Sequence, residues 1–330
     1  MANQSSSSSY PILCASFNQD ASLFVIGTRE GFKVFDSNTG RLCYERAIGA
    51  FIVVEMLFTS SLLAIVGAGE QPSLSPRRLC LFNITTGTAL RELNFLTSIL
   101  AVRMNKERLI VILQDKTYVY DINKVKILDA IDTVPNPKGL CGFSPSLDGC
   151  FLALPASITK GSVLLYNVME LQSHCESYSF RRGTYPSTIF SLSFAPSKQI
   201  PDILVATSSS GSLHVFSLGF ALNQRSRKSS TILGSIIPNS ITDALDPAHR
   251  HVLHNAVTAG VKSNAVIRKV DKVADASTPG ISFCKATISI ITYNGYFQEY
   301  SFRLNYQNEP LWTLEHEFNL LSPVSDNASS

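Results

Sequence analysis

Short runs of β-branched and aromatic residues alternate with polar turn clusters along most of this 330-residue chain. Turn clusters such as Asn18-Gln19-Asp20 and Asn38-Thr39-Gly40 separate the runs, which is the pattern of antiparallel strands joined by tight turns. The runs come in groups of four, and a new group starts about every forty residues, which is the repeat of a β-propeller blade. The pattern therefore predicts an all-β protein, a β-propeller of four-stranded blades.

The first three units have the clearest alternation, and their third strands share an apolar-polar-apolar-aromatic pattern, as in Phe32–Phe35. A polar residue usually follows that aromatic residue, so the units are similar to WD-type repeats that have lost the Trp-Asp pair. The strands expected in these units are Ile12–Phe17, Leu23–Thr28, Phe32–Phe35, Leu42–Arg46, Ile52–Phe58, Leu62–Val66, Arg78–Phe82, Ala89–Leu93, Ile99–Met104, Arg108–Leu113, Thr117–Tyr120 and Ile127–Ile131.

Three further units complete a predicted ring of six blades, because an unclosed propeller would leave two exposed sheet edges. The single domain is expected to span residues 10–320, with disordered segments at 1–9 and 321–330 and a long insertion at 220–264. The strands expected here start at Leu140 and continue through Phe151–Leu154, Val163–Tyr166, Tyr178–Arg181, Thr188–Phe194, Ile203–Ala206, Leu213–Phe216, Ala265–Val270, Ile281–Cys284, Thr287–Thr292, Tyr296–Phe302 and Leu311–His316.

The composition argues against several functions. Lys plus Arg number 28 and Asp plus Glu number 25, a net charge of +3 that is too small for bulk nucleic-acid binding. Seven scattered cysteines without a Cys-x-x-Cys pair argue against a disulfide framework or a zinc site and fit a reducing compartment. No apolar run reaches the length of a membrane span and the serine-rich start has no apolar core of a signal peptide, so we expect a soluble intracellular protein.

An arginine pair stands out in this lightly charged chain, within Phe180-Arg181-Arg182-Gly183. Successive strand residues point to opposite faces, so Arg181 and Arg182 would each meet a different anion. The planar guanidinium suits two parallel hydrogen bonds to a phosphate. The alternative is a solvated surface pair, which is what two adjacent arginines usually are.

The predicted insertion at 220–264 combines a basic stretch, Arg225–Ser230, with an apolar run. Basic residues beside apolar ones suit contact with a membrane surface, and the expected membrane-contacting residues are Ile232, Leu233, Ile236 and Ile237. Asp246-Pro247-Ala248 predicts the start of a helix with an Asp cap and Pro at its first position. The alternatives are a disordered loop or a helix packed on the propeller, and the three nearby histidines have poor spacing for a metal site.

The repeat pattern, the Phe-Arg-Arg-Gly motif and the late insertion together resemble the PROPPIN family, the β-propellers that bind polyphosphoinositides in autophagy. Ala15–Asp20 and Gly67–Pro72 add to the resemblance, and Ser177–Phe194 is similar to plant members in particular. The resemblance implies a peripheral membrane adaptor that binds phosphatidylinositol 3-phosphate and phosphatidylinositol 3,5-bisphosphate. It also implies a cytoplasmic protein that attaches to autophagosome-precursor, endosomal or vacuolar membranes, without a cofactor.

By the family pattern, Arg181 serves one lipid site and Arg182 the other, and the second site adds the hydroxyl residues Ser208 and Ser212. Tyr185 stands where some relatives carry a basic residue or His. The resemblance also implies that a loop of the second blade contacts an autophagy lipid-transfer protein, here through Pro72, an exposed Leu74, Arg77 and Arg78. A plain surface loop is the alternative.

The chain departs from the family in its blade count, because relatives have seven blades and the pattern here gives six. The missing length falls between Tyr166 and Phe180, which puts the Arg181 site in doubt. Two functions therefore stay open: a lipid-binding adaptor, or a protein-interaction scaffold with impaired lipid binding. An enzyme is disfavoured, because no phosphate-binding Gly-rich loop or nucleophile motif occurs.

Overall fold

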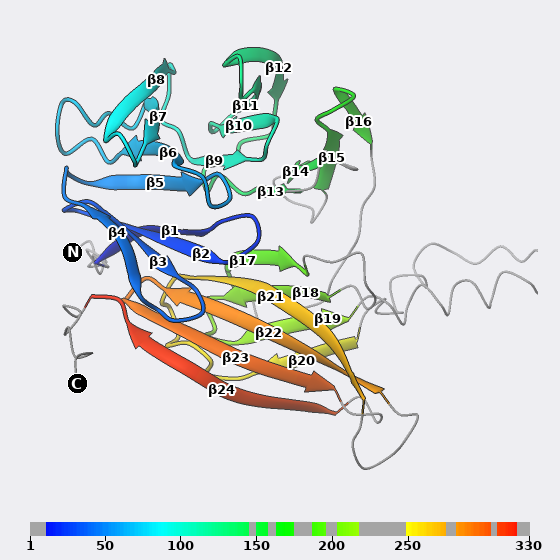
Figure 1. The fold of residues 1–330 in the computed structure, drawn as a ribbon. Helices are drawn as coiled ribbons and strands as arrows, with labels where there is room; N and C mark the ends of the chain where they lie inside the picture. The colour runs from blue at the N-terminus through cyan, green and yellow to red at the C-terminus, as the bar shows by residue number, and fades with distance from the viewer. Residues whose placement is uncertain are drawn as a thin grey trace, which may run out of the picture.

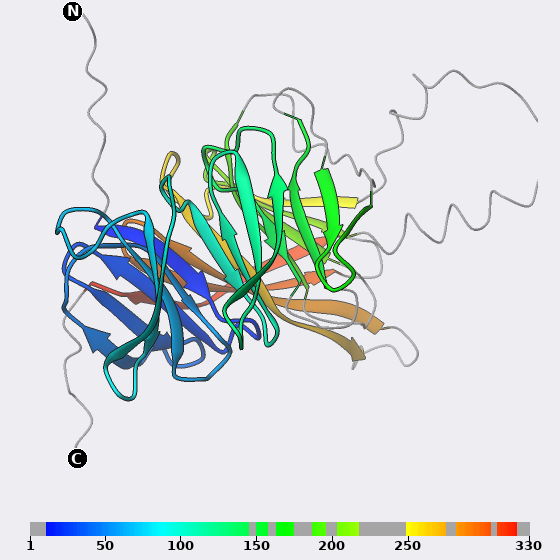
Figure 2. The same cartoon turned by 90° about the horizontal axis from the view of Figure 1, so that it is seen from above.

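Six four-stranded antiparallel sheets, built one after another along the chain, form the blades of a propeller in this computed structural model (Figures 1 and 2). The structure describes residues 11–144, 150–157, 163–174, 187–195, 203–217, 249–274, 282–304 and 309–321. The all-β fold with six blades predicted from the sequence is confirmed. No helix occurs among the described residues, and none there is long and apolar enough to cross a membrane.

Blades 1 to 3 follow the sequence prediction closely, and each strand begins and ends within two residues of the expected position. The four strands of each blade are adjacent in sequence and in the sheet, so every blade is a simple meander. Blade 1 contains β1 (Ile12–Phe17), β2 (Leu23–Thr28), β3 (Phe32–Asp36) and β4 (Leu42–Arg46); blade 2 contains β5 (Phe51–Met56), β6 (Leu62–Gly67), β7 (Arg78–Asn83) and β8 (Thr88–Asn94); blade 3 contains β9 (Ala101–Met104), β10 (Arg108–Ile112), β11 (Lys116–Asp121) and β12 (Lys126–Asp132).

Blades 4 to 6 differ more from the prediction, and the strands of blade 6 are longer than the other strands that the structure describes, as Figure 1 shows. Blade 4 contains β13 (Gly142–Phe143), β14 (Phe151–Pro155), β15 (Val163–Asn167) and β16 (Gln172–His174); blade 5 contains β17 (Ile189–Phe194), β18 (Ile203–Ser208), β19 (Leu213–Ser217) and β20 (His249–Leu253); blade 6 contains β21 (Ser263–Ala274), β22 (Ser282–Thr292), β23 (Tyr296–Leu304) and β24 (Pro310–Asn319).

Four expectations about these blades are wrong. The fourth strand of blade 4 is β16 and not Tyr178–Arg181, because Gln172–His174 already pairs with β15. The fourth strand of blade 5 is β20, which pairs with β19, so the predicted helix after Asp246 is a strand from His249. Ala265–Val270 instead belongs to β21, the first strand of blade 6, and the two runs expected at Ile281–Cys284 and Thr287–Thr292 form one strand, β22.

The core consists of separate apolar clusters, each between two neighbouring blades. Val25 and Val34 of blade 1 face Val54 and Met56 of blade 2, and comparable clusters join blades 2 and 3, blades 3 and 4, and blades 5 and 6. Because each sheet uses its alternate residues for its two neighbours, both faces of a blade are apolar.

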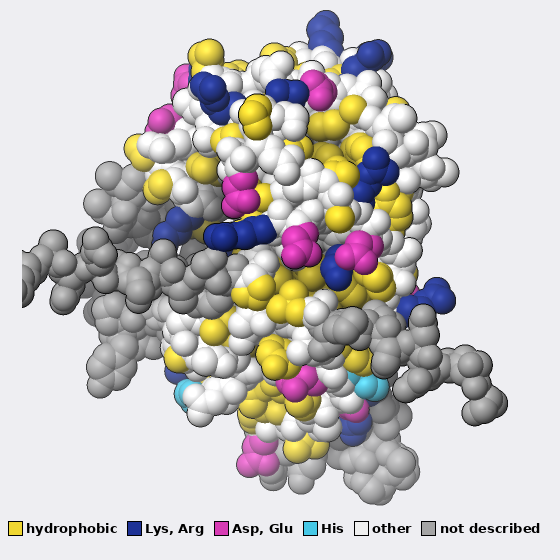
Figure 3. Space-filling view, turned by 90° about the vertical axis from the view of Figure 1, so that its left-hand side faces the viewer, with side chains coloured by type: hydrophobic (Ala, Val, Ile, Leu, Met, Phe, Trp, Pro, Cys, Tyr) yellow, Lys and Arg dark blue, Asp and Glu magenta, His cyan; other side chains and the backbone are white. Residues whose placement is uncertain are grey.

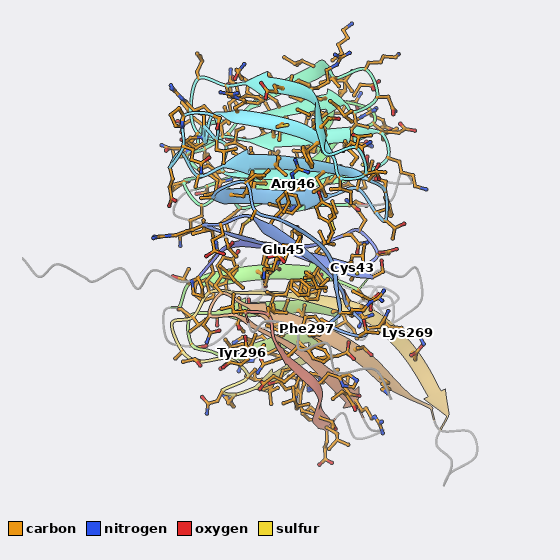
Figure 4. The ribbon with its side chains drawn as sticks, turned by 60° about the vertical axis from the view of Figure 1, so that its left-hand side comes forward. Cys43, Glu45, Arg46, Lys269, Tyr296 and Phe297 are labelled. Atoms are coloured by element: carbon orange, nitrogen blue, oxygen red, sulfur yellow. The ribbon has the colours of Figure 1, made fainter. Side chains whose placement is uncertain are left out.

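Blades 1 and 6 share no strand, and they are joined by side-chain packing and by a backbone hydrogen bond. The rings of Phe24 and Phe297 stack with centroids 4.9 Å apart, and the amide of Ile12 donates a hydrogen bond of 3.3 Å to the carbonyl of Tyr293. Figure 4 labels Phe297 in this region of the molecule. On the other side of blade 1, the Arg46 guanidinium lies 5.2 Å from the ring centre of Phe82 in blade 2.

Candidate functional site

The predicted lipid site is described in part. Its two arginines, Arg181 and Arg182, lie outside the described residues, and the same holds for the four predicted membrane-contacting residues Ile232, Leu233, Ile236 and Ile237. The predicted hydroxyl residues Ser208 and Ser212 are described, as is the chain from Ser187, five positions after Arg182. The geometry of the site is therefore that of its hydroxyl-bearing side.

Ser208 and Ser212 flank the tight turn that joins β18 to β19. Gly211 makes this turn possible, since its φ of +76° lies in the left-handed region that side chains disfavour. The backbone of residues 257–260 presses against the turn, and a Cβ on Gly211 would lie 2.3 Å from the carbonyl oxygen of Val257. Two hydrogen bonds fix the contact, from the Val257 amide to the Gly211 carbonyl at 3.0 Å and from the Gly260 amide to the Ser209 carbonyl at 2.9 Å.

Hydroxyl groups of the turn form two hydrogen-bonded pairs, and one of them includes the segment just before β17. The Ser208 and Ser210 hydroxyls are hydrogen-bonded at 2.9 Å, as are those of Ser187 and Ser209. The Thr188 amide also donates to the Ser209 hydroxyl at 3.0 Å, and the Ser209 amide donates to the Thr188 carbonyl at 2.8 Å. The chain from Ser187, four positions after the Phe-Arg-Arg-Gly motif, is thus held against the turn.

Burial divides the hydroxyls into two kinds. Ser208 and Ser212 are almost fully buried, whereas Ser209 is half-buried and Ser210 is exposed. The residues of this turn that contact solvent are therefore Ser209 and Ser210, and the resemblance points to neither of them. The run Thr207–Ser212 contained the signal, but only the turn geometry shows which of its residues contact solvent.

The sequence around the arginine pair lacks acidic residues. The sequence has no Asp or Glu from residue 177 to residue 201, so no carboxylate on this stretch can neutralise the two arginines. Elsewhere the surface is mixed, and the face shown in Figure 3 carries Lys and Arg side chains interspersed with Asp and Glu. Any anion site must therefore be local, as the small net charge also requires.

The predicted partner-docking loop is ordered by its own backbone. The Leu74 amide donates to the Gln71 carbonyl at 3.0 Å, and the Gly69 amide donates to the Leu74 carbonyl at 2.8 Å. The expectation of an exposed Leu74 is wrong, because this side chain packs on the cluster between blades 1 and 2. Pro72 and Arg77 are exposed, and Arg78 is half-buried with its guanidinium 3.4 Å from the Glu92 carboxylate.

A charge pair lies elsewhere, on the first strands of blades 2 and 3, and joins the buried Glu55 to the half-buried Arg103. The Glu55 carboxylate is 3.4 Å from the Arg103 guanidinium, and Arg103 also donates to the carbonyl of Val102 at 2.9 Å. Burial raises the pKa of Glu55 to about 6, and the nearby charge of Arg103 offsets part of this increase. Since a guanidinium holds the carboxylate, we assign the pair a structural role. No group of metal-ligating side chains occurs in the described part of the chain.

Known proteins resemble this chain in both sequence and fold. The PROPPIN family model matches residues 11–177. Autophagy-related protein 18b of Arabidopsis thaliana is 61% identical over 98% of this chain and 99% of its own length, and autophagy-related protein 18 of Dictyostelium discoideum is 30% identical over 96% and 95%. Kluyveromyces lactis Hsv2 with loop 6CD replaced by a Gly-Ser linker has a similar fold, with a TM-score of 0.65 and 14% identity over 94% of this chain and 100% of that one.

The Arabidopsis alignment also measures the missing length. It has 363 positions, whereas 98% of this 330-residue chain is about 323 residues, so about 40 positions have no residue in this chain. That is the length of one propeller blade. The match to the family model ends at residue 177, inside the stretch where the blade was expected to be missing. By its sequence and its fold, the chain is a member of the PROPPIN family.

Proposed function

We propose that this protein is a phosphoinositide-binding peripheral membrane adaptor in autophagy, which recognises phosphatidylinositol 3-phosphate and phosphatidylinositol 3,5-bisphosphate through Phe180-Arg181-Arg182-Gly183. One observation carries the proposal beyond family membership. The bond between Ser187 and Ser209 holds the chain that follows the motif against a turn with accessible hydroxyls. Arginine and hydroxyl donors side by side are what an inositol phosphate needs.

In this proposal Arg182 binds the headgroup phosphate together with the hydroxyl turn, and Arg181 assists from the other face of the strand. Ser208 and Ser212, being buried, shape the turn, while Ser209 and Ser210 donate to the phosphate. The absence of acidic residues from 177 to 201 leaves the cation charge available for the ligand. An acidic residue in this stretch would lower the affinity for the lipid headgroup, because its carboxylate would compete for the same guanidinium.

Vesicle sedimentation tests the proposal. Vesicles containing phosphatidylinositol 3-phosphate should pellet the protein, and the variant with Arg181→Thr and Arg182→Thr should stay in the supernatant. A matched control is Arg77→Thr with Arg78→Thr, which removes the same charge from another adjacent pair and should still pellet. Equal pelleting of the motif variant would refute the proposal, and failure of the unaltered protein to pellet would favour the scaffold function without lipid binding.

Two further parts of the function are proposed with it. The apolar residues Ile232, Leu233, Ile236 and Ile237 enter the membrane next to the bound headgroup, so replacing all four by Ser should weaken vesicle binding. Pro72 and Arg77, the exposed members of the docking loop, contact an autophagy lipid-transfer protein, with Leu74 and Arg78 supporting the loop from within. Arg77→Glu should therefore reduce that interaction and leave vesicle binding unchanged.

A further inference from the structure

The first strand of each blade follows one rule in this molecule. Its last residue faces the preceding blade around the ring, as Phe17 of β1, Met56 of β5 and Met104 of β9 show by packing into the clusters they share with that neighbour. Each of the three side chains is at most 9% exposed. The residue two positions earlier, Val54 in β5 and Val102 in β9, points the same way and is buried too.

Blade 5 has the same residues in the same places, but they are exposed. Phe194 ends β17 and pairs with Leu204 as Met56 pairs with Leu63, and Leu192 pairs with Ala206. Phe194 is 62% exposed and Leu192 is 63% exposed. Apolar side chains at a position that is buried in three other blades indicate a missing neighbour.

The face of blade 4 that points to blade 5 is also less buried than its counterparts in other blades. The central pair that faces the following blade is Val25 and Val34 in blade 1, and Ile110 and Val119 in blade 3, and all four are buried. The corresponding pair in blade 4 is Ala153 and Leu165, and both are only half-buried. Among the described residues, no apolar cluster joins blade 4 to blade 5, whereas every other junction of the ring has one.

The two exposed faces are of the kind that a blade covers. We call this junction the seam and define it by Leu192 and Phe194 on blade 5 and by Ala153 and Leu165 on blade 4. Its residues are apolar and continue the alternation that lines the other junctions, so they suit the face of a sheet better than solvent. The length that could fill it is known, because about 40 alignment positions lack a residue in this chain and one blade has that length.

The geometry points to a docking site for a blade supplied in trans: the seam binds a segment of about forty residues of a partner polypeptide, folded as a four-stranded antiparallel sheet with two apolar faces. Side chains of Leu192 and Phe194 pack on one face of the segment, and those of Ala153 and Leu165 pack on the other. Recognition occurs through sheet faces, as between all other blades, and does not require strand exchange. Lipid binding at the arginine pair is a separate property and can be measured separately.

The test uses the natural segment that fits such a place. The probe is the segment of the Arabidopsis relative that corresponds to the interval between Tyr166 and Phe180 of this chain, where the missing length was expected, produced as a separate polypeptide fused to a soluble carrier. Titration calorimetry with the full chain should show a one-to-one complex, and the complex should unfold at a higher temperature than the free chain. The variant with Leu192→Asp and Phe194→Asp should bind at least tenfold more weakly.

Controls separate the seam from general stickiness and from misfolding. Leu311 and Leu314 on β24 are also exposed, at 59% and 47%, so Leu311→Asp with Leu314→Asp should bind the probe like the unaltered chain. Leu192→Ser with Phe194→Ser is a milder seam variant, and its circular dichroism should match that of the unaltered chain. A chimera that carries the segment within the chain should no longer bind the probe.

Four outcomes would overturn the inference. The first is that the unaltered chain does not bind the probe. The second is that both seam variants bind the probe as tightly as the unaltered chain does, and the third is that the chimera binds it undiminished. The fourth is a homodimer that the seam variants convert to monomers, which would mean that a second copy of this chain occupies the seam in place of a partner blade.

Discussion

Two junctions of the same ring differ sharply, although each has apolar residues on both sides. Between blades 6 and 1, Phe297 stacks on Phe24, and an ion pair between Arg268 and Glu299 also holds the carbonyl of Ser37 in blade 1. Between blades 4 and 5, Leu192 and Phe194 are mostly exposed. The difference shows that apolar strand residues alone do not close a propeller, because the neighbouring blade must also be present.

The largest expected effect contrasts these junctions directly. Phe297→Ala removes a fully buried ring that stacks on Phe24, and we expect a loss of about 3–5 kcal/mol in the free energy of unfolding. Phe194→Ala removes a ring that is mostly in solvent, and we expect a change within about 0.5 kcal/mol. Urea unfolding followed by fluorescence measures both, and similar losses for the two variants would show that the seam is closed in solution.

The ion pair tests how much of the closed junction depends on charge. Arg268 and Glu299 are 14% and 13% exposed and lie 2.5 Å apart, so Arg268→Ala should cost about 1.5–3 kcal/mol by leaving a nearly buried carboxylate unpaired. The neighbouring Lys269 is 69% exposed and pairs with Asp271 at 3.0 Å, so Lys269→Ala should cost less than about 1 kcal/mol. An equal cost for both would mean that the junction is held by packing alone.

The contrast also bears on what the sequence could predict. Strands of blades 1 to 3 were predicted within two residues because each has a clear apolar alternation between turn clusters. β20 was predicted as a helix because Asp246-Pro247 is a good helix start, while its strand form depends on pairing with β19, which lies more than thirty residues earlier. β22 was divided in two because Lys285 interrupts the apolar run, yet its pairing with β21 continues through that residue.

The functional site was predictable only by residue type. The resemblance implied Ser208 and Ser212, and only the structure shows that these two are buried while Ser209 and Ser210 contact solvent in a turn made by the left-handed Gly211. Leu74 was expected to be exposed for a similar reason, since a loop between two prolines gives no sign that one side chain folds back on the core. The missing blade was predictable because a count of repeats needs no tertiary information.

A pH-dependent effect should arise in the closed part of the ring. Burial raises the pKa of Glu55 to about 6 from its ordinary value of 4.5, so folding takes up a proton between these two values. The contribution of Glu55 to stability is therefore full below pH 4.5 and is lost as the pH rises through 6, by about 2 kcal/mol in total. Glu55→Gln should remove this component, and thermal unfolding from pH 4 to pH 7 should show the difference between variant and unaltered protein shrinking at low pH.

The smallest expected effect on stability lies at the seam itself. Leu192→Asp with Phe194→Asp should leave the free energy of unfolding within about 0.5 kcal/mol, because both side chains are more than half exposed and their removal opens no cavity. Urea unfolding of the variant and of the unaltered chain measures this change. A clear loss of stability would mean that these side chains are buried in solution, and the seam would then be an ordinary junction between blades 4 and 5 with no place for a further blade.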